Sequence, residues 1–211
     1  MGALVRSECY ASADDISAKA EKWVETLGRR RRWPSPPDKP ALLVLDMQRY
    51  FLMEGHAFVP AGLSIIPNIR DMIVDFNGPV IFTRHVDSGE EDNLMGTWWN
   101  DSIGGERSEI HEGLSDLADD VIVKEHYSPF RGTDLEDRLR DRSVDSVVIS
   151  GLMTDLCCET TAREAFMRGF RVYFLADATA TNTEGRHLSS LKAVSRGFGE
   201  VLTSRELRSL L

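Results

Sequence analysis

Cysteine is scarce in this sequence, whose 211 residues include only three: Cys9, Cys157 and Cys158. A disulfide framework or a structural zinc site needs spaced pairs of cysteine or histidine, and this pattern excludes both. The adjacent pair Cys157 and Cys158 is not expected to form a disulfide, because vicinal bridges are strained. Cysteine usage this sparse is typical of a reducing compartment and predicts a cytoplasmic protein.

Long apolar runs are also missing. No stretch approaches the length needed to cross a bilayer, and the first ten residues lack the apolar core of a signal peptide. Basic residues are outnumbered, since 25 lysines and arginines face 34 aspartates and glutamates, and the formal net charge is −9. That charge disfavours nucleic acid and anionic membranes as partners. The one basic cluster, residues 29–32, is interpreted as a solvated linker.

Glycine-rich phosphate loops are absent as well. Neither GxGxxG nor GxxxxGK followed by Ser or Thr occurs, so nucleotide binding has no support and we expect no cofactor. Apolar residues make up 42% and charged residues 28% of the chain, which is typical of a globular protein. The length suits one domain with a substantial core.

What the sequence does contain is a regular alternation of strands and helices from residue 41 onward. Short apolar runs predict six strands, at 41–47, 79–85, 121–127, 146–152, 171–178 and 200–204. Periodic segments predict helices at 65–76, 134–142, 156–168, 184–196 and 205–211. This alternation indicates βαβ units, hence an α/β fold with a doubly wound, mostly parallel six-stranded sheet. The polar, glycine-rich residues 86–106 predict a long loop.

The N-terminal region has a different character. Ser12 followed by Asp15 predicts a capping box that opens a helix ending at Gly28. The apolar stripe of that helix needs a surface to cover, in its own domain or on a neighbouring subunit. A proline-rich connector follows, since prolines cannot continue a helix. We therefore expect residues 1–39 to be a helix with a connector, and residues 40–211 to form the main domain.

Three polar residues stand at or near the carboxyl ends of predicted strands. Asp46 ends the first strand, Lys124 lies in the third, and Cys157 begins the helix after the fourth. The carboxyl ends of parallel strands face one crevice, where such sheets bind their ligands. A carboxylate, an ammonium and a thiol are therefore expected to meet there.

The roles of these residues follow from elementary chemistry. A helix N-terminus and a nearby ammonium both favour the thiolate, so we expect a lowered pKa for Cys157. The Asp46 carboxylate can take the thiol proton and later pass it to a leaving group. Each residue also has an ordinary interpretation: a turn cap for Asp46, a solvated side chain for Lys124, and a small buried apolar residue for Cys157.

Three motifs around these residues resemble the isochorismatase-like cysteine hydrolase superfamily. They are LLVLDMQRYF at 42–51, KEHYSPFRGTDLEDRL at 124–139 and GLMTDLCCETTAREAF at 151–166, and they occur in the superfamily's order. The resemblance spans about residues 40–205. It implies a Rossmann-like sheet and a catalytic Asp-Lys-Cys triad, carried here by Asp46, Lys124 and Cys157.

The resemblance implies further features of the site. A cis peptide bond is expected between Leu152 and Met153, with the backbone N–H groups of Met153 and Cys157 as the oxyanion hole. Members of the superfamily commonly form oligomers, so a dimer or tetramer is expected. We also expect the pocket for a small-molecule substrate to be lined by Phe51, His85, Trp99, Tyr127 and Phe130.

A metal ion is not expected. The nicotinamidase branch of the superfamily binds a divalent ion through an Asp-x-His pair after the second strand and another histidine. Here the order is reversed, as His85-Val86-Asp87, which favours His85 as a pocket-lining residue or strand cap. His56 is the only other candidate nearby, and His126 and His187 have no recognisable partners.

The substrate class follows from two departures within the superfamily. The motif DMQRYFL at 46–52 resembles aryl isochorismatases, but those enzymes usually have glycine where Cys157 stands. They also carry an arginine upstream of the loop tryptophan, facing an anionic substrate. Residues 88–98 hold no arginine or lysine here, and instead contain Glu90, Glu91 and Asp92. Both departures favour an amide over isochorismate.

We therefore predict a cysteine-dependent hydrolase of a small amide, ureido or carbamoyl compound, acting through a thioester. Two alternatives stay open. One is an isochorismatase-type vinyl-ether hydrolase in which the thiol is a bystander. The other is a catalytically silent module for binding or assembly.

Overall fold

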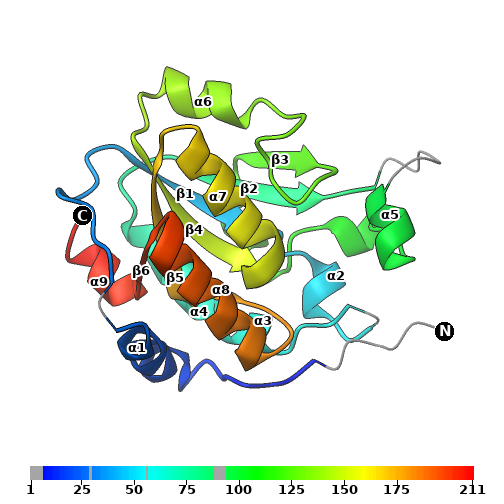
Figure 1. The fold of residues 1–211 in the computed structure, drawn as a ribbon. Coiled ribbons are helices and arrows are strands. Elements are labelled where there is room, and N and C mark those ends of the chain that lie inside the picture. The colour runs from blue at the N-terminus through cyan, green and yellow to red at the C-terminus, as the bar shows by residue number, and fades with distance from the viewer. Residues whose placement is uncertain (1–6, 29, 56, 88–93) are drawn as a thin grey trace.

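A six-stranded parallel sheet forms the centre of the part of the chain that the structure describes (Figure 1). The computed structural model describes residues 7–28, 30–55, 57–87 and 94–211. The strands are β1 (Pro40–Leu45), β2 (Val80–His85), β3 (Val121–Lys124), β4 (Ser146–Leu152), β5 (Arg171–Ala180) and β6 (Glu200–Leu202). They pair in parallel in the order β3-β2-β1-β4-β5-β6. The predicted doubly wound α/β fold is confirmed.

Burial explains why these segments form strands. Every residue of β1 and β4 is buried, as expected for central strands that are covered on both faces. On the edge strand β3, by contrast, Val123 is exposed. The carboxyl ends of β1 and β4 approach so closely that a Cβ on Gly151 would lie 2.0 Å from the Leu45 carbonyl oxygen. Glycine is required there, and its φ of +106° also favours glycine.

Helices cover both faces of the sheet. In Figure 1, α7 (Glu159–Met167) and α8 (Glu184–Gly197) lie in front of it, and α4 (Ile66–Asp75) lies behind. The chain also forms α6 (Leu135–Asp141) and α9 (Ser204–Arg208), both close to their predicted bounds. None of the helices in the described ranges has the length and apolar content to span a bilayer.

Short helices are where the sequence prediction fails. The structure contains α2 (Arg49–Leu52), α3 (Ala61–Ser64) and α5 (Leu94–Trp99), and two 3₁₀ turns at Gly105–Ser108 and Ser115–Leu117. The helix α5 lies within the segment 86–106 that was expected to be a loop. Elements of four to six residues contain little more than one helical turn, so they show no usable hydrophobic period.

The N-terminal helix α1 (Ile16–Thr26) packs against its own domain. Ile16 and Trp23 are buried, and Trp23 Nε1 donates to Glu184 on α8 at 2.7 Å. The helix begins at Ile16, later than the capping-box prediction. One of the two bonds of the predicted box is present, because the Asp15 carboxylate accepts the Ser12 N–H at 2.7 Å, but this bond closes a turn ahead of the helix.

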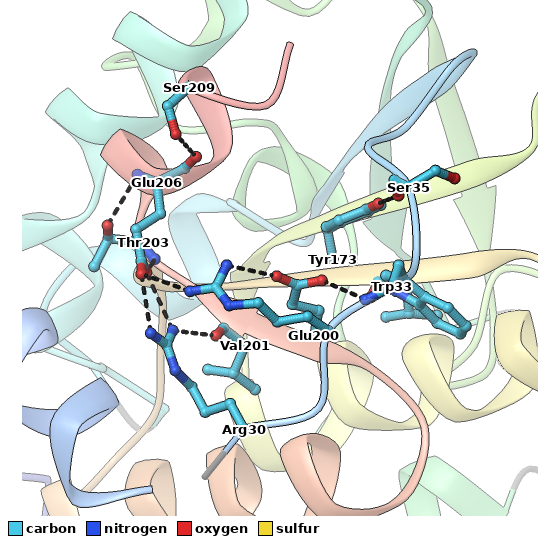
Figure 2. Close-up of polar contacts among 11 residues, drawn as sticks. Arg30, Trp33, Ser35, Tyr173, Glu200, Val201, Thr203, Glu206 and Ser209 are labelled. Atoms are coloured by element: carbon cyan, nitrogen blue, oxygen red, sulfur yellow. Dashed lines mark hydrogen bonds and ion pairs between the residues drawn. The ribbon is translucent and has the colours of Figure 1, made fainter. Parts of the chain in front are cut away.

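The connector after α1 is anchored at the start of β6. Arg30 donates to Glu206 at 3.0 Å, and Glu200 accepts the backbone N–H of Trp33 at 2.9 Å (Figure 2). Arg32 donates to Glu200 at 3.0 Å. The interpretation of this basic cluster as a solvated linker is therefore wrong for Arg30, which is largely buried against Glu206. Arg32 stays half exposed while it pairs with Glu200, and Arg29 lies outside the described residues.

Candidate active site

Asp46 stands directly after β1, shielded from solvent. Its φ of +50° lies in the left-handed region, at the point where the chain leaves the sheet. Thr83 on β2 holds it twice: the hydroxyl donates to Asp46 Oδ1 at 2.6 Å and accepts the Asp46 N–H at 3.2 Å. One carboxylate oxygen is thereby anchored, and the other is left to Lys124.

Lys124 connects the predicted residues. Its Nζ donates to Asp46 Oδ2 at 2.7 Å, to the His126 carbonyl at 2.9 Å and to Cys157 Sγ at 3.6 Å. An ammonium has three protons, so each has an acceptor. Burial favours the neutral amine, but Asp46 and Cys157 outweigh it and raise the pKa of Lys124. The predicted meeting of Asp46, Lys124 and Cys157 is confirmed, around a charged lysine.

Cys157 lies in a π-helical turn, Thr154–Cys158, which joins β4 to α7. Burial raises the pKa of the Cys157 thiol, the nearby Asp46 carboxylate raises it further, and Lys124 offsets only part of this. The expected lowering of this pKa is therefore wrong for the resting protein. Burying a thiolate costs free energy, and its attraction to the Lys124 ammonium does not offset that cost, because Lys124 is already paired with Asp46. The thiol rests in its protonated form.

The neighbouring residues complete this turn. Cys158 faces the core, where its Sγ lies 4.0 Å from the Ser150 carbonyl oxygen, so it does not share the position of Cys157. The peptide bond between Leu152 and Met153 is cis, as the resemblance implies. The Met153 carbonyl accepts the N–H groups of Leu156, at 3.0 Å, and Cys158, at 3.1 Å, which brings the two ends of the turn together.

Sequence reasoning did not identify two buried residues that position the site. One is Thr83, which anchors Asp46. The other is Gln48, whose amide oxygen accepts the His85 N–H at 2.9 Å. Its amide nitrogen donates to the carbonyls of His85, at 2.9 Å, and Ser108, at 2.8 Å. The available signal was a polar residue in or beside an apolar run, because a buried polar group needs a hydrogen-bond partner.

Two of the predicted pocket residues join the substrate loop to the segment that follows β3. Trp99 at the end of α5 donates from Nε1 to the Tyr127 hydroxyl at 2.9 Å. Burial raises the pKa of Tyr127, an effect that the hydrogen bond from Trp99 opposes and the nearby Cys157 reinforces. Tyr127 is thus within electrostatic range of Cys157, and Trp99 is tied to it by this hydrogen bond.

The two phenylalanines differ in their surroundings. Phe51 on α2 is buried edge-to-face against Tyr50, with ring centroids 4.9 Å apart, close along the chain to Asp46. Phe130 stacks on Phe170 at 6.0 Å. Phe170 directly precedes β5 and so lies at the amino ends of the strands, opposite the triad. The contacts of Phe130 are those of a core residue, and we do not retain it in the pocket.

The His85 and Asp87 side chains do not fit a metal site. His85 Nε2 lies 3.2 Å from Asp87 Oδ1, and Asp87 Oδ2 accepts the Ile103 N–H at 2.6 Å, so these donor atoms bond to the protein. Within the described ranges, no three His, Cys, Asp or Glu side chains are grouped to hold an ion. The other candidate, His56, lies outside the described residues.

Comparison with known proteins agrees with this geometry. Residues 40–206 match the isochorismatase domain family. Nicotinamidase 3 from Arabidopsis thaliana is 38% identical over 81% of this chain and 88% of its own length. Enterobactin synthase component B from Escherichia coli is 34% identical over 83% of this chain, which spans 64% of that protein. The solved structure of a cysteine hydrolase from Pseudomonas syringae has a TM-score of 0.78 at 28% identity, and covers 87% of this chain and 99% of its own.

The family domain fills most of the chain, and the fold carries the triad at the edge of the sheet where ligands bind. The protein belongs to the isochorismatase-like hydrolase family.

Proposed function

We propose that this protein is a cysteine hydrolase that cleaves the C–N bond of a small amide, ureido or carbamoyl compound. The observation that carries the proposal is the Lys124 ammonium, which hydrogen-bonds both the Asp46 carboxylate and the Cys157 thiol. One cation thereby holds a proton acceptor beside a nucleophile. A relative named as a nicotinamidase supports an amide as the substrate.

The first half of the reaction forms a thioester. Because the thiol rests protonated, Asp46 takes its proton as Sγ attacks the carbonyl carbon. The N–H groups of Met153 and Cys157 hold the negative charge that develops on the carbonyl oxygen. As the tetrahedral intermediate collapses, the C–N bond breaks and Asp46 returns the proton to the departing amine or ammonia.

The second half releases the acid. Water enters where the amine left, Asp46 takes one of its protons, and the resulting hydroxide attacks the thioester carbonyl. The C–S bond breaks, and the sulfur of Cys157 regains the proton from Asp46. Lys124 stays charged throughout, so it keeps Asp46 ionised before each proton transfer and stabilises the thiolate while it exists.

The surroundings of the triad favour a neutral or singly charged substrate. The acids Glu90, Glu91 and Asp92 lie outside the described residues, but the same loop contributes the carboxylates of Asp87 and Asp101, which the structure does describe. A dicarboxylate such as isochorismate needs a cationic anchor beyond Lys124, all of whose protons are already engaged. We therefore propose that Phe51, His85, Trp99 and Tyr127 surround a small amide that is neutral or carries a single charge.

A direct competition tests the proposal. The kcat/KM of the purified protein is measured for isochorismate and for a panel of carboxamides, ureides and carbamoyl compounds, with ammonia or amine release as the readout. We expect measurable kcat/KM for compounds of the panel and a negligible kcat/KM for isochorismate. If isochorismate were the best substrate and Cys157→Gly kept that activity, the protein would be a vinyl-ether hydrolase. If no compound were turned over, the silent binding module would replace our proposal.

A further inference from the structure

His85 lies on the catalytic side of β2. Successive side chains of a strand point to opposite faces, so His85 shares the face of Thr83, two residues earlier. Thr83 bonds Asp46 at 2.6 Å, and the strand register pairs His85 with Lys124. The His85 side chain is only 6% exposed. Its imidazole is therefore a buried neighbour of the residues that carry the proposed reaction.

One nitrogen of this imidazole is satisfied and the other is not. Nε2 lies 3.2 Å from Asp87 Oδ1. Nδ1 is buried and has no hydrogen-bond partner among the residues that the structure describes. Buried polar atoms without partners are rare, because removing such a group from water carries an uncompensated cost. A hydrogen-bonding group of a bound molecule is expected at Nδ1.

The hydrogen-bond network assigns the polarity of Nδ1. A carboxylate only accepts hydrogen bonds, so Asp87 Oδ1 faces an N–H on Nε2. The second carboxylate oxygen is held by the Ile103 N–H at 2.6 Å, which fixes the orientation of Asp87. Gln48 clamps the backbone of His85 on both sides. In the neutral imidazole, a proton on Nε2 leaves Nδ1 as an acceptor.

We propose that His85 is a specificity-determining residue, whose Nδ1 accepts a hydrogen bond from an N–H group of the substrate beside the scissile amide. The inference rests on the proposed amide hydrolysis and narrows its substrate class. Ureides, and ring carboxamides with a pyrrole-type N–H, carry such a donor. Analogues that present an ether oxygen or a pyridine-type nitrogen at the same point place two acceptors face to face. His85 and Asp87 thus distinguish a substrate with a hydrogen-bond donor at this point from one with an acceptor.

The substitution Asp87→Asn should change Nδ1 of His85 from a hydrogen-bond acceptor to a donor. The Ile103 N–H accepts nothing, so the asparagine must present its oxygen there and turn its NH₂ toward His85. Nε2 then becomes the acceptor, and the imidazole proton moves to Nδ1, which becomes a donor. Asp101→Asn is the matched control, because it removes the same charge from the same loop without touching His85. Asp101 accepts instead from the Tyr50 hydroxyl, at 2.8 Å.

The probes are near-isosteric pairs: pyrrole-2- and pyrrole-3-carboxamide against the corresponding furan carboxamides. Their Kd values are measured calorimetrically on the Cys157→Ala protein, which does not consume them, and their kcat/KM values on the unsubstituted protein. We expect one pyrrole isomer to bind at least about tenfold more tightly than its furan partner, the effect of one buried hydrogen bond. Asp101→Asn should keep this order, Asp87→Asn should reverse it, and His85→Phe should abolish it.

A second measurement does not depend on any substitution. The ¹⁵N chemical shifts of the His85 ring should report a proton on Nε2 and none on Nδ1 in the unsubstituted protein. A proton on Nδ1, equal affinity for pyrrole and furan, or the same response of both asparagine variants would overturn the proposal. If the pyrrole preference is found without any turnover, the hydrogen-bond assignment stands and the proposed hydrolysis fails. If amides are turned over but pyrrole and furan compounds bind equally, the proposed hydrolysis stands and the role of His85 fails.

Discussion

Two charge clusters lie at opposite ends of the parallel strands, here called the carboxyl edge and the amino edge of the sheet. At the carboxyl edge, Asp46 pairs with Lys124 at 2.7 Å, and neither side chain is exposed. At the amino edge, where β6 begins, Glu200 is 4% exposed and pairs with Arg32 at 3.0 Å. Both clusters place a buried carboxylate against a cation, although the Arg32 side chain is half exposed and that of Lys124 is not, so burial of a carboxylate does not by itself distinguish a reactive site from a structural one.

The difference lies in what surrounds each carboxylate. Glu200 and Glu206 face guanidinium groups and backbone N–H groups, none of which gives up a proton (Figure 2). Burial of Glu206 opposes its ionisation, but the hydrogen bonds from Arg30 outweigh this and lower the pKa of Glu206. Asp46 instead shares its cation with a protonated thiol. A buried carboxylate becomes chemically useful where a movable proton lies beside it.

The largest expected effect is on activity at the carboxyl edge. Cys157→Ala removes the proposed nucleophile and should lower kcat by about a thousandfold or more. Cys158→Ala is the matched control, because the neighbouring thiol faces Ser150 in the core, and this variant should keep kcat within a few-fold. Steady-state amide hydrolysis measures both. Equal losses in the two variants would remove the distinction between the cysteines.

Breaking the Asp46–Lys124 pair should be the largest effect on stability. Lys124→Met leaves a buried carboxylate without its cation, and the free energy of unfolding should fall by about 3–5 kcal/mol. The double variant Asp46→Asn/Lys124→Met has no buried charge at this position and should recover most of that loss. Both variants should be inactive. Urea unfolding with activity assays tests this, and a double variant as unstable as the single one would contradict it.

Acid should weaken the carboxyl edge before the amino edge. His187 Nδ1 on α8 lies 2.9 Å from Thr154 Oγ1, in the turn that carries Cys157, and its ring meets Trp23 edge-to-face. Burial lowers the pKa of His187 to about 3, well below its value of 6.5 when exposed. The unfolded chain therefore binds this proton first, and stability that is complete above pH 6.5 is lost as the pH falls, by roughly 2 kcal/mol between pH 8 and pH 5.

The control for this prediction is His187→Gln, which should flatten the dependence of the unfolding free energy on pH between 8 and 5. Glu206 also loses its contribution as the pH falls, but in a lower range, since its lowered pKa keeps that contribution intact until the pH falls below the ordinary range of glutamate. Identical slopes for the unsubstituted protein and His187→Gln would show that another group governs this acid limb.

The smallest expected effect is at the amino edge. Arg30→Met removes the ion pair with Glu206, which Arg32 still contacts, and should cost about 1 kcal/mol in the free energy of unfolding. The kcat of amide hydrolysis should not change, because the cluster lies at the other end of the strands. The exposed Arg31→Met is the matched control and should be neutral. A fall in kcat for Arg30→Met would mean that the two edges are coupled.

The apolar pattern of the sequence was enough to predict the sheet and its strands. Runs such as 41–47 and 146–152 are buried on both faces, and a run without polar alternation indicates that kind of strand. The polar residues that end or follow those runs then had to gather at one edge, because parallel strands all point the same way. For this reason Asp46, Lys124 and Cys157 could be named without coordinates, with the family motifs choosing Cys157 over Cys158.

The tertiary structure alone decided the protonation and partners of these residues. Whether the Cys157 thiol is ionised depends on how much water and how many charges surround it, and its contacts come from chain segments more than 30 residues away. The bonding of His85 to Asp87, and the clamp by Gln48, depend on side-chain directions that no residue pattern encodes. Sequence determines which groups reach the edge of the sheet, and packing determines which atoms then share a proton.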